Sequence, residues 1–200
     1  MALTDNLISY WSLDETSGNA PDAHGSIDLT DNNTVGTAVG IVSNARDFNG
    51  SDEHLSSNSD ATFDFGDTDF SMSFWVKFDA TGGGHGMAGY GSSWFVITNF
   101  DGNGTIAFFV NNFAASAAWS DDIDADVWYH VVVKHDSASN LLVVIVNDGT
   151  PVTAGHSGGI TTGTQNFTIG MARAGTNYLN GKLDEFGVWS RVITSGEVTE

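Results

Sequence analysis

The sequence predicts an all-β protein, built as a two-sheet antiparallel β-sandwich. Apolar and polar residues alternate over short segments, turn residues are frequent, and helical periodicity is nearly absent. The chain has 200 residues with 24 glycines and 2 prolines, and we expect roughly ten to twelve short strands in it. No linker and no repeat of fixed period divides the pattern, so residues 1–200 are expected to form one domain.

The strands can be placed in order along the chain. The first covers residues 7–15, a polar loop over residues 22–34 holds a short strand at Ile27 and Leu29, and residues 45–57 form two strands around a turn at Asn49 and Gly50. Alternation within residues 69–78 places five large apolar side chains on one face and Ser71, Ser73, Trp75 and Lys77 on the other. Further strands are expected at residues 93–100, 105–112, 126–136, 140–149, 166–170 and 179–194, with a turn at 101–104 and a short helix beginning near residue 195.

The charge balance excludes several classes of function. The chain carries 25 acidic and 6 basic residues, a formal net charge of −19, which would repel nucleic acids and anionic membranes. The acidity indicates either solubility in a salty environment or binding of divalent cations. There is no cysteine, so neither disulfides nor thiolate metal sites are expected. No apolar run is long enough to span a bilayer.

No secretion signal is visible after Met1. We therefore expect a protein that stays inside the cell, one whose signal has been removed, or one exported without a signal, for example by virion assembly. The location that we favour is extracellular or on a virion surface.

Seven segments, in this order, resemble the laminin-G-like jelly roll of the concanavalin A-like lectin/glucanase superfamily. The resemblance runs from about Asn6 to Glu200 and implies the concanavalin A-like jelly roll as the fold. It does not imply one activity, because this fold hosts lectins, glycosidases, adhesion modules and structural modules. The segments are YWSLDETSG (10–18), ARDFNGSDEHL (45–55), DFSMSFWVKF (69–78), VWYHVVVKHD (127–136), LLVVIVNDGTPV (141–152), FTIG (167–170) and NGKLDEFGVWSRVIT (180–194).

Asp184 lies inside the apolar run of the last strand, where a carboxylate without a partner is costly. The resemblance implies a structural calcium ion on the convex side, bound by Asp184 together with backbone carbonyls near Leu13 or Asp14 and near Ser51 or Asp52. Calcium accepts such mixed oxygen ligands. The alternative is that Asp184 accepts backbone N–H groups without a metal.

Other candidate metal ligands are less well arranged. Asp122, Asp124 and Asp126 alternate like half of a calcium loop but lack its turn glycine and terminal glutamate, so we interpret them as a solvated acidic loop. The six histidines are scattered, and His130 and His135 are expected on opposite faces of one strand. A zinc site is therefore not expected.

Sugar binding requires aromatic surfaces beside amide and carboxylate groups. The residues of these types around two strands and their loops are Trp94, Tyr90, Asn99, Asn111, Asn112 and Trp119. Trp94 is the strongest candidate, and the alternative is that these aromatic residues belong to the core. Trp11, Trp75, Trp128 and Trp189 are expected in the core.

Catalysis is not expected. The glucanases of this fold are similar to one another in a strand with the pattern Glu-x-Asp-x-x-Glu, which places two carboxyl groups at the scissile bond. This chain has no such pattern.

The sequence therefore favours a non-catalytic carbohydrate-binding or adhesion module, with a glycan or a viral or cell-surface protein as partner. Display on a virus or phage particle, as a decoration or fibre protein, is a further hypothesis. One alternative is a structural module that docks onto a capsid or neighbouring subunit and binds no sugar. A third is a glycoside hydrolase with an unrecognised site.

Overall fold

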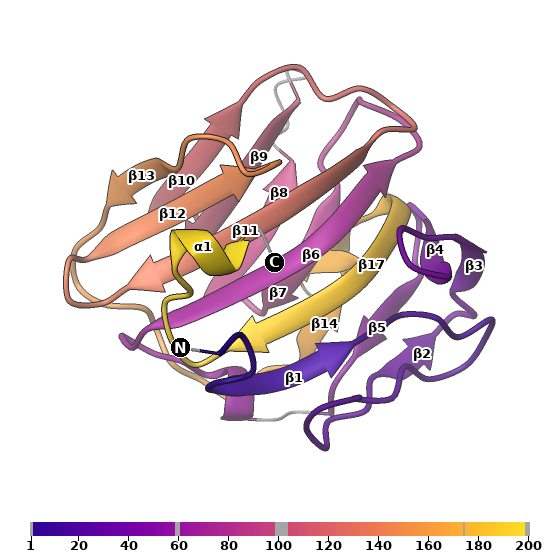
Figure 1. The fold of residues 1–200 in the computed structure, drawn as a ribbon, viewed down its shortest axis with the longest axis horizontal. Coiled ribbons are helices and arrows are strands. Elements are labelled where there is room, and N and C mark those ends of the chain that lie inside the picture. Colours follow the sequence, from indigo (N-terminus) through magenta and orange to yellow (C-terminus); the bar gives the residue numbers. More distant parts are fainter. Residues whose placement is uncertain (1, 59–60, 99–103, 174, 199–200) are drawn as a thin grey trace.

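Two antiparallel sheets lie face to face in the computed structural model, which describes residues 2–58, 61–98, 104–173 and 175–198 (Figure 1). The larger sheet contains β1 (Leu7–Trp11), β3 (Gly36–Val39), β4 (Asn44–Asn49), β6 (Phe70–Phe78), β11 (Trp128–Asp136), β12 (Leu141–Val146), β13 (Val152–Gly155) and β17 (Asn180–Trp189). Its strand order is β13-β12-β11-β6-β17-β4-β3, and β1 pairs with β17 beside β4. The predicted two-sheet sandwich is confirmed.

The second sheet has seven strands in the order β10-β9-β8-β7-β14-β5-β2. They are β2 (Thr30–Asn32), β5 (His54–Ser56), β7 (Gly86–Tyr90), β8 (Trp94–Thr98), β9 (Thr105–Val110), β10 (Ala115–Ser120) and β14 (Phe167–Ile169). A small hairpin, β15 (Met171–Arg173) and β16 (Thr176–Tyr178), is separate from both sheets, and the helical elements are η1 (Ala61–Phe63) and α1 (Ser195–Val198).

The seventeen strands within the described residues exceed the expected ten to twelve. Strand β7 was missed because its sequence, GMAGY, has few large apolar residues. Its glycines are needed for packing, since a Cβ on Gly89 would lie 1.9 Å from the carbonyl oxygen of Ala172 in β15. The strand predicted at Ile27 and Leu29 is wrong, because Leu29 forms only an isolated bridge with Ala20. Residues 99–103, the end of one predicted strand and most of its turn, lie outside the described residues.

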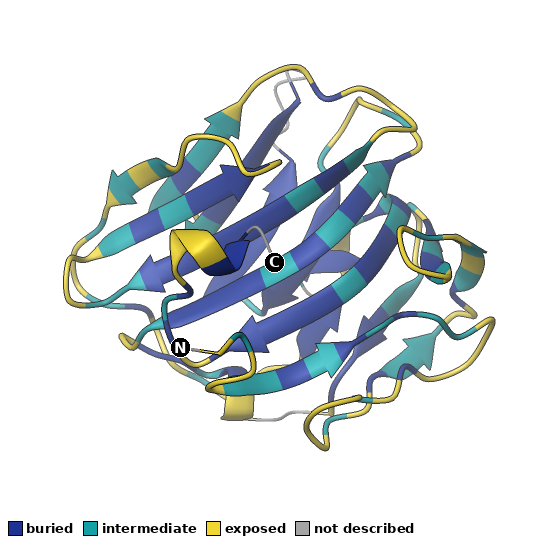
Figure 2. Ribbon diagram, viewed as in Figure 1, coloured by how far each residue is buried: buried dark blue, intermediate teal, exposed yellow. Residues whose placement is uncertain are grey.

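The main core lies between the sheets, and Figure 2 shows that buried residues are frequent in the central strands of both sheets. The alternation predicted for β6 is confirmed, because its inward side chains Phe70, Met72, Phe74, Val76 and Phe78 are all fully buried. Trp11 also lies in this core, as expected, and its ring stacks on Phe167 at a centroid distance of 5.4 Å.

A second apolar cluster covers part of the outer face of the larger sheet. Helix α1 and the first residues of the chain lie over this face (Figure 1), and the cluster consists of Val132, Ile145, Trp189, Ile193 and Val198 with Leu3, Leu7 and Val143 packed against it. The pairing of Arg191 with Glu197 at 2.7 Å holds the helix in place. The outer face beside this cluster remains open and carries the candidate site.

Candidate functional site

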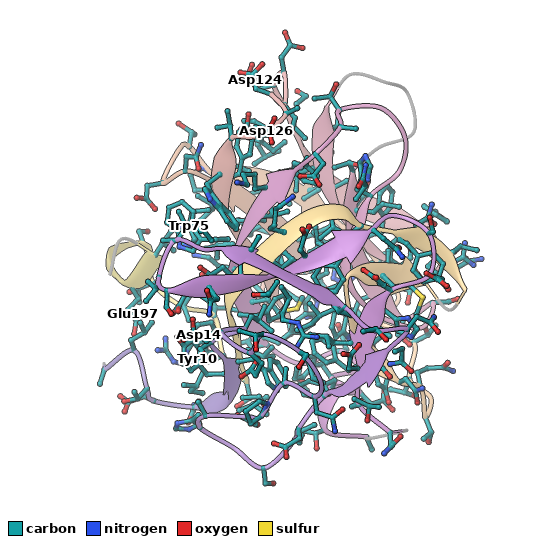
Figure 3. All side chains as sticks on the ribbon, turned by 90° about the vertical axis from the view of Figure 1, so that its right-hand side faces the viewer. Tyr10, Asp14, Trp75, Asp124, Asp126 and Glu197 are labelled. Atoms are coloured by element: carbon teal, nitrogen blue, oxygen red, sulfur yellow. The ribbon has the colours of Figure 1, made fainter. Side chains whose placement is uncertain are left out.

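A groove of about 330 Å³ crosses the outer face of the larger sheet, over β1, β6, β11 and β17. Its lining includes four rings and a carboxyl group, from Tyr10, Trp75, His130, Trp189 and Glu185. Tyr10 and Trp75 lie on the same side of the molecule as Glu197 of α1 (Figure 3). The groove therefore combines aromatic surfaces with a charged group at one place.

Strand register explains why this face is hollow. Gly187 of β17 lies opposite Ser73 of β6 on one side and Tyr10 of β1 on the other. Two small residues thus meet in the middle of the outer face, with larger residues around them. A Cβ on Gly187 would lie 2.5 Å from the ring of Trp189, so only glycine lets that ring lie along the groove.

The next row across the sheet forms one wall. Trp75 lies opposite His130 of β11 and Asp184 of β17. The Trp75 and His130 rings stack with centroids 5.0 Å apart, and His130 Nε2 lies 2.8 Å from the Ser73 hydroxyl. This contact orients the imidazole, and the imidazole supports the Trp75 ring.

A β-bulge positions Glu185. The pairing of β17 with β6 shifts between Asp184 and Gly187, and Glu185 adopts a positive φ of 53°. A bulge redirects the side chain of its extra residue. Glu185 accepts a short hydrogen bond from the Tyr10 hydroxyl through Oε2, and a carboxylate has further acceptor capacity on its second oxygen, Oε1, for a hydroxyl of a ligand.

The electrostatics of the groove follow from burial. Burial and the Glu185 carboxylate raise the pKa of Tyr10, so its hydroxyl stays protonated and donates. Burial also lowers the pKa of His130, although Asp148 opposes this effect. His130 is therefore neutral at pH 7, and Glu185 supplies the groove with one negative charge.

The prediction that Trp94 and Tyr90 form a sugar-binding surface is wrong. Both side chains are fully buried, because they point between the two sheets. Trp94 donates from its indole nitrogen to the carbonyl of Phe63 at 3.1 Å, and the Tyr90 hydroxyl accepts from the backbone of Gln165 at 3.2 Å. They belong to the core, as the alternative interpretation held.

The other predicted sugar ligands do not converge. Asn111 bridges to the loop after β13, donating to Gly159 at 2.6 Å and accepting from Thr161 at 2.7 Å, while Asn112 is exposed. Trp119 is half-buried and pairs with Ile106 at the far end of the β9–β10 hairpin. Asn99 lies outside the described residues. Trp75 and Trp128, both expected in the core, are instead half-buried on the outer face, and Trp75 forms part of the groove wall.

Asp184 is fully buried, and its surroundings partly suit a cation. Its Oδ2 accepts N–H groups of Ile41 and Val42 at 2.7 and 3.1 Å, whereas its Oδ1 is buried without a hydrogen-bond partner. Burial raises the pKa of Asp184 to about 6, with the two N–H groups opposing the rise. One carboxylate oxygen is thus available to a metal, and the other caps a backbone loop.

The remaining predicted calcium ligands gather only in part. The Asp14 backbone carbonyl accepts the side-chain amide of Asn44 at 3.0 Å, and the Asp14 carboxylate accepts the backbone N–H of Asn44 at 2.9 Å. Leu13 is buried with a φ of 63°. Ser51 and Asp52 cannot contribute. They lie in a turn beyond Asn49, which pairs with Asn180, and four residues of extended strand, about 13 Å, separate that position from Asp184. The loop at residues 40–43 occupies the place predicted for them.

The acidic loop at Asp122, Asp124 and Asp126 is exposed, and Asp124 lies near the upper tip of the molecule in Figure 3. Within the described part of the chain, no helix has the length and apolar character needed to cross a membrane.

Several solved structures are similar to this fold. Domain 4 of AbnA, a GH43 extracellular arabinanase from Geobacillus stearothermophilus in complex with arabinotriose, matches with a TM-score of 0.75 and 18% identity over 97% of both chains. The binding domain of botulinum neurotoxin DC in complex with SialylT matches with a TM-score of 0.74 and 14% identity, over 98% of this chain and 51% of that one. Trypanosoma rangeli sialidase in complex with sialic acid matches with a TM-score of 0.73 and 19% identity, over 98% of this chain and 32% of that one.

At these identities the similarity concerns the fold. No curated protein sequence matches the chain. The laminin G family model described as the concanavalin A-like lectin/glucanases superfamily matches residues 49–199, more than half of the sequence. The protein is therefore a member of the concanavalin A-like lectin/glucanases superfamily.

Proposed function

We propose that the protein is a non-catalytic carbohydrate-binding module whose ligand occupies the groove over β1, β6, β11 and β17. The observation that carries the proposal is the grouping of Trp75 and Tyr10 with the Glu185 carboxylate in one hollow. Sugars bind where an aromatic face meets their C–H groups and polar atoms meet their hydroxyls. Glycan complexes among the similar structures, with arabinotriose, sialic acid and SialylT, support this class of ligand.

The charge of the groove favours an uncharged sugar. Glu185 is negative, His130 is neutral at pH 7, and the whole chain has a net charge of −19. Acidic sugars would be repelled by this field, whereas a neutral sugar can donate a hydroxyl to Oε1 of Glu185. We therefore expect neutral glycans to bind and sialylated ones to bind weakly.

An array of neutral and sialylated glycans, followed by calorimetry on the strongest ligand, tests the proposal. Trp75→Ala should weaken binding about tenfold, since an aromatic contact contributes about 0.5–1.5 kcal/mol beyond burial. Trp128→Ala is the matched control, because Trp128 is half-buried on the same outer face but lies under Lys77, away from the groove lining. Unchanged affinity in Trp75→Ala, or binding of sialylated glycans alone, would contradict the proposal.

The non-catalytic part of the proposal rests on the carboxyl groups. A typical glycosidase needs two of them across the bond that it cleaves, and among the residues that the structure describes Glu185 is the one carboxyl residue lining the groove. Asp184 lies next in sequence but is buried beneath Ile41 and Val42. Release of sugar from a polysaccharide panel, lost in Glu185→Gln, would instead establish a glycoside hydrolase.

A structural docking module is the second candidate, and one observation favours it. The end of β3 and the loop that follows it, beside the groove, expose Val39, Ile41 and Val42 by 79%, 42% and 53%. Exposed apolar side chains in a group often mark protein contacts. A blank glycan array together with binding to a protein shell that is lost in Val39→Ser with Ile41→Ser would favour this function.

Calcium at Asp184 is a further proposal, supported by the unpartnered Oδ1. In that site Asp184 would bind the ion through Oδ1 and keep its N–H partners on Oδ2. A ligand that binds only the folded state at a hundredfold excess over Kd adds about 2.7 kcal/mol of stability. Melting temperature measured with calcium and with chelator tests it, and equal values would refute the site.

Extracellular location and display on a virus or phage particle are hypotheses that only the acidic composition of the chain supports. Immunogold labelling of particles with an antibody against this chain tests them. Labelling confined to the cell interior would contradict both.

A further inference from the structure

Three side chains of types that commonly bind metals meet at one end of the sandwich, from separate parts of the chain. They are Asp67, which precedes β6, His135 on β11, and His156, which follows β13. Their ligand atoms all lie within 4.8 Å of one another. His135 Nε2 is 2.8 Å from His156 Nε2 and 3.6 Å from Asp67 Oδ1. None of the three lines the groove on the outer face.

The protonation of His135 is set by its surroundings. Its Nδ1 lies 2.7 Å from the backbone carbonyl of Thr68, which can only accept, so Nδ1 carries the ring proton. Its Nε2 therefore presents a lone pair toward His156 and Asp67. A histidine that donates through one nitrogen to a backbone carbonyl and points the other at a shared centre has the usual arrangement of a metal ligand.

His156 can supply a second lone pair. Its backbone N–H donates to the carbonyl of Asn140 at 3.0 Å, which holds the residue beside His135. Its Nδ1 is buried and has no hydrogen-bond partner among the described residues. This nitrogen can therefore carry the ring proton. Nε2 is then free to bind a cation together with His135.

We propose that Asp67, His135 and His156 form a binding site for a zinc-class divalent transition metal. Two imidazole nitrogens and one carboxylate suit zinc, and calcium prefers oxygen ligands. Two ligands about 2.0–2.1 Å from one tetrahedral ion lie roughly 3.3 Å apart, and the observed separations of 2.8 and 3.6 Å bracket that distance. The Asp67 side chain is 50% exposed, so solvent reaches the fourth position.

The metal would fasten a loop as well as the three ligands. A Cβ on Gly159 would lie 3.3 Å from Asp67, and the Gly159 carbonyl accepts from Asn111, which follows β9 of the other sheet. The segment at 156–161 is thus connected to β11 through His156 and to the second sheet through Asn111. A bound ion would strengthen the first of these connections and raise the stability of the whole domain.

Zinc titration of the chelator-treated full chain, followed by calorimetry and melting temperature, tests the proposal. We expect one equivalent to bind and to raise the melting temperature, and cobalt to give the visible absorption of a tetrahedral site. His156→Gln and Asp67→Asn should each weaken zinc binding at least about tenfold, since even loss of an outer partner costs 10–100-fold. Both positions are partly exposed, so these variants should fold, whereas His135 is part of the core.

His24→Gln is the matched control, because His24 lies in an exposed loop. This variant should bind zinc as the unmodified chain does. Absence of stoichiometric zinc binding, or equal zinc affinity in His156→Gln and the unmodified chain, would overturn the proposal. Loss of binding in His24→Gln would show an adventitious surface site and would also overturn it. None of these outcomes depends on whether the groove binds sugar.

Discussion

Gly187 on β17 lies directly opposite Ser73 on β6, and this pair of small residues forms the floor of the groove. Their neighbours Trp75 and Trp189 have large side chains. The hollow therefore exists because Gly187 and Ser73 have little or no side chain to fill it. The apolar cluster around Trp189 and α1 covers part of this sheet face. The hollow at Gly187 and Ser73 beside that cluster is available to a ligand.

Gly187→Ala should destabilise the protein and narrow the groove. The new Cβ would lie 2.5 Å from the Trp189 ring, and relief of such overpacking typically costs about 1–3 kcal/mol. Urea unfolding measures the loss. Gly82→Ala is the control, since a Cβ there has no neighbour within 4 Å. Equal stability of both variants would show that Trp189 moves freely.

Asp184→Asn should flatten the pH dependence of stability. The folded protein holds the pKa of Asp184 at about 6, above its ordinary value of 3.8. The folded state therefore binds more protons than the unfolded state between these values, and stability falls as the pH rises through them. The neutral amide removes this fall and also removes any stabilisation by calcium.

Urea unfolding from pH 4 to 7 measures the effect of Asp184→Asn. Asp124→Asn, at an exposed position, is the control and should keep the slope of the unmodified protein. An unchanged slope in Asp184→Asn would contradict the assignment of the titration to Asp184.

Glu197→Gln should have the opposite pH signature. The Arg191 guanidinium and the N–H and hydroxyl of Thr194 lower the pKa of Glu197 to about 2, from an ordinary value of 4.5. A lowered carboxyl pKa contributes stability above the ordinary value and loses it as the pH falls toward 2. The variant should therefore melt at a lower temperature at neutral pH and lose less stability on acidification. Parallel melting curves for both proteins across this range would refute the assignment.

Arg46→Met should be strongly destabilising. The Arg46 side chain is fully buried and donates to the carbonyls of Gly18 and Val35 at 2.7 and 3.0 Å and to Asp31 at 3.2 Å. Removing one partner of a buried charge pair costs about 3–5 kcal/mol.

The double variant Arg46→Met with Asp31→Asn should lose less stability than the sum of the two single changes. The second change removes the Asp31 carboxylate charge, which Arg46→Met alone leaves without its partner. Urea unfolding of the four proteins gives this coupling energy. Strict additivity would show that the pair does not interact.

The alternation in β6 shows how far the sequence reaches. It correctly separated Phe70, Phe74 and their companions from Ser73 and Trp75, because successive side chains of a strand point to opposite faces. It did not reveal that the outer face stays open at Trp75. The cover of that face comes from the first residues of the chain and from α1, which lie far from β6 in sequence.

The sequence by itself determined the all-β class, the two-sheet sandwich, the family and the burial of Asp184, because these follow from local periodicity and from the order of short motifs. Only the tertiary structure decided that Trp94 is core and Trp75 lines a groove, that residues 40–43 rather than Ser51 and Asp52 reach Asp184, and that His135 meets His156. Each of these depends on which strands become neighbours and in what register. Strand pairing brings together residues that are far apart in the chain. Alternation along one strand shows which of its side chains share a face, but it does not show which part of the protein packs against that face.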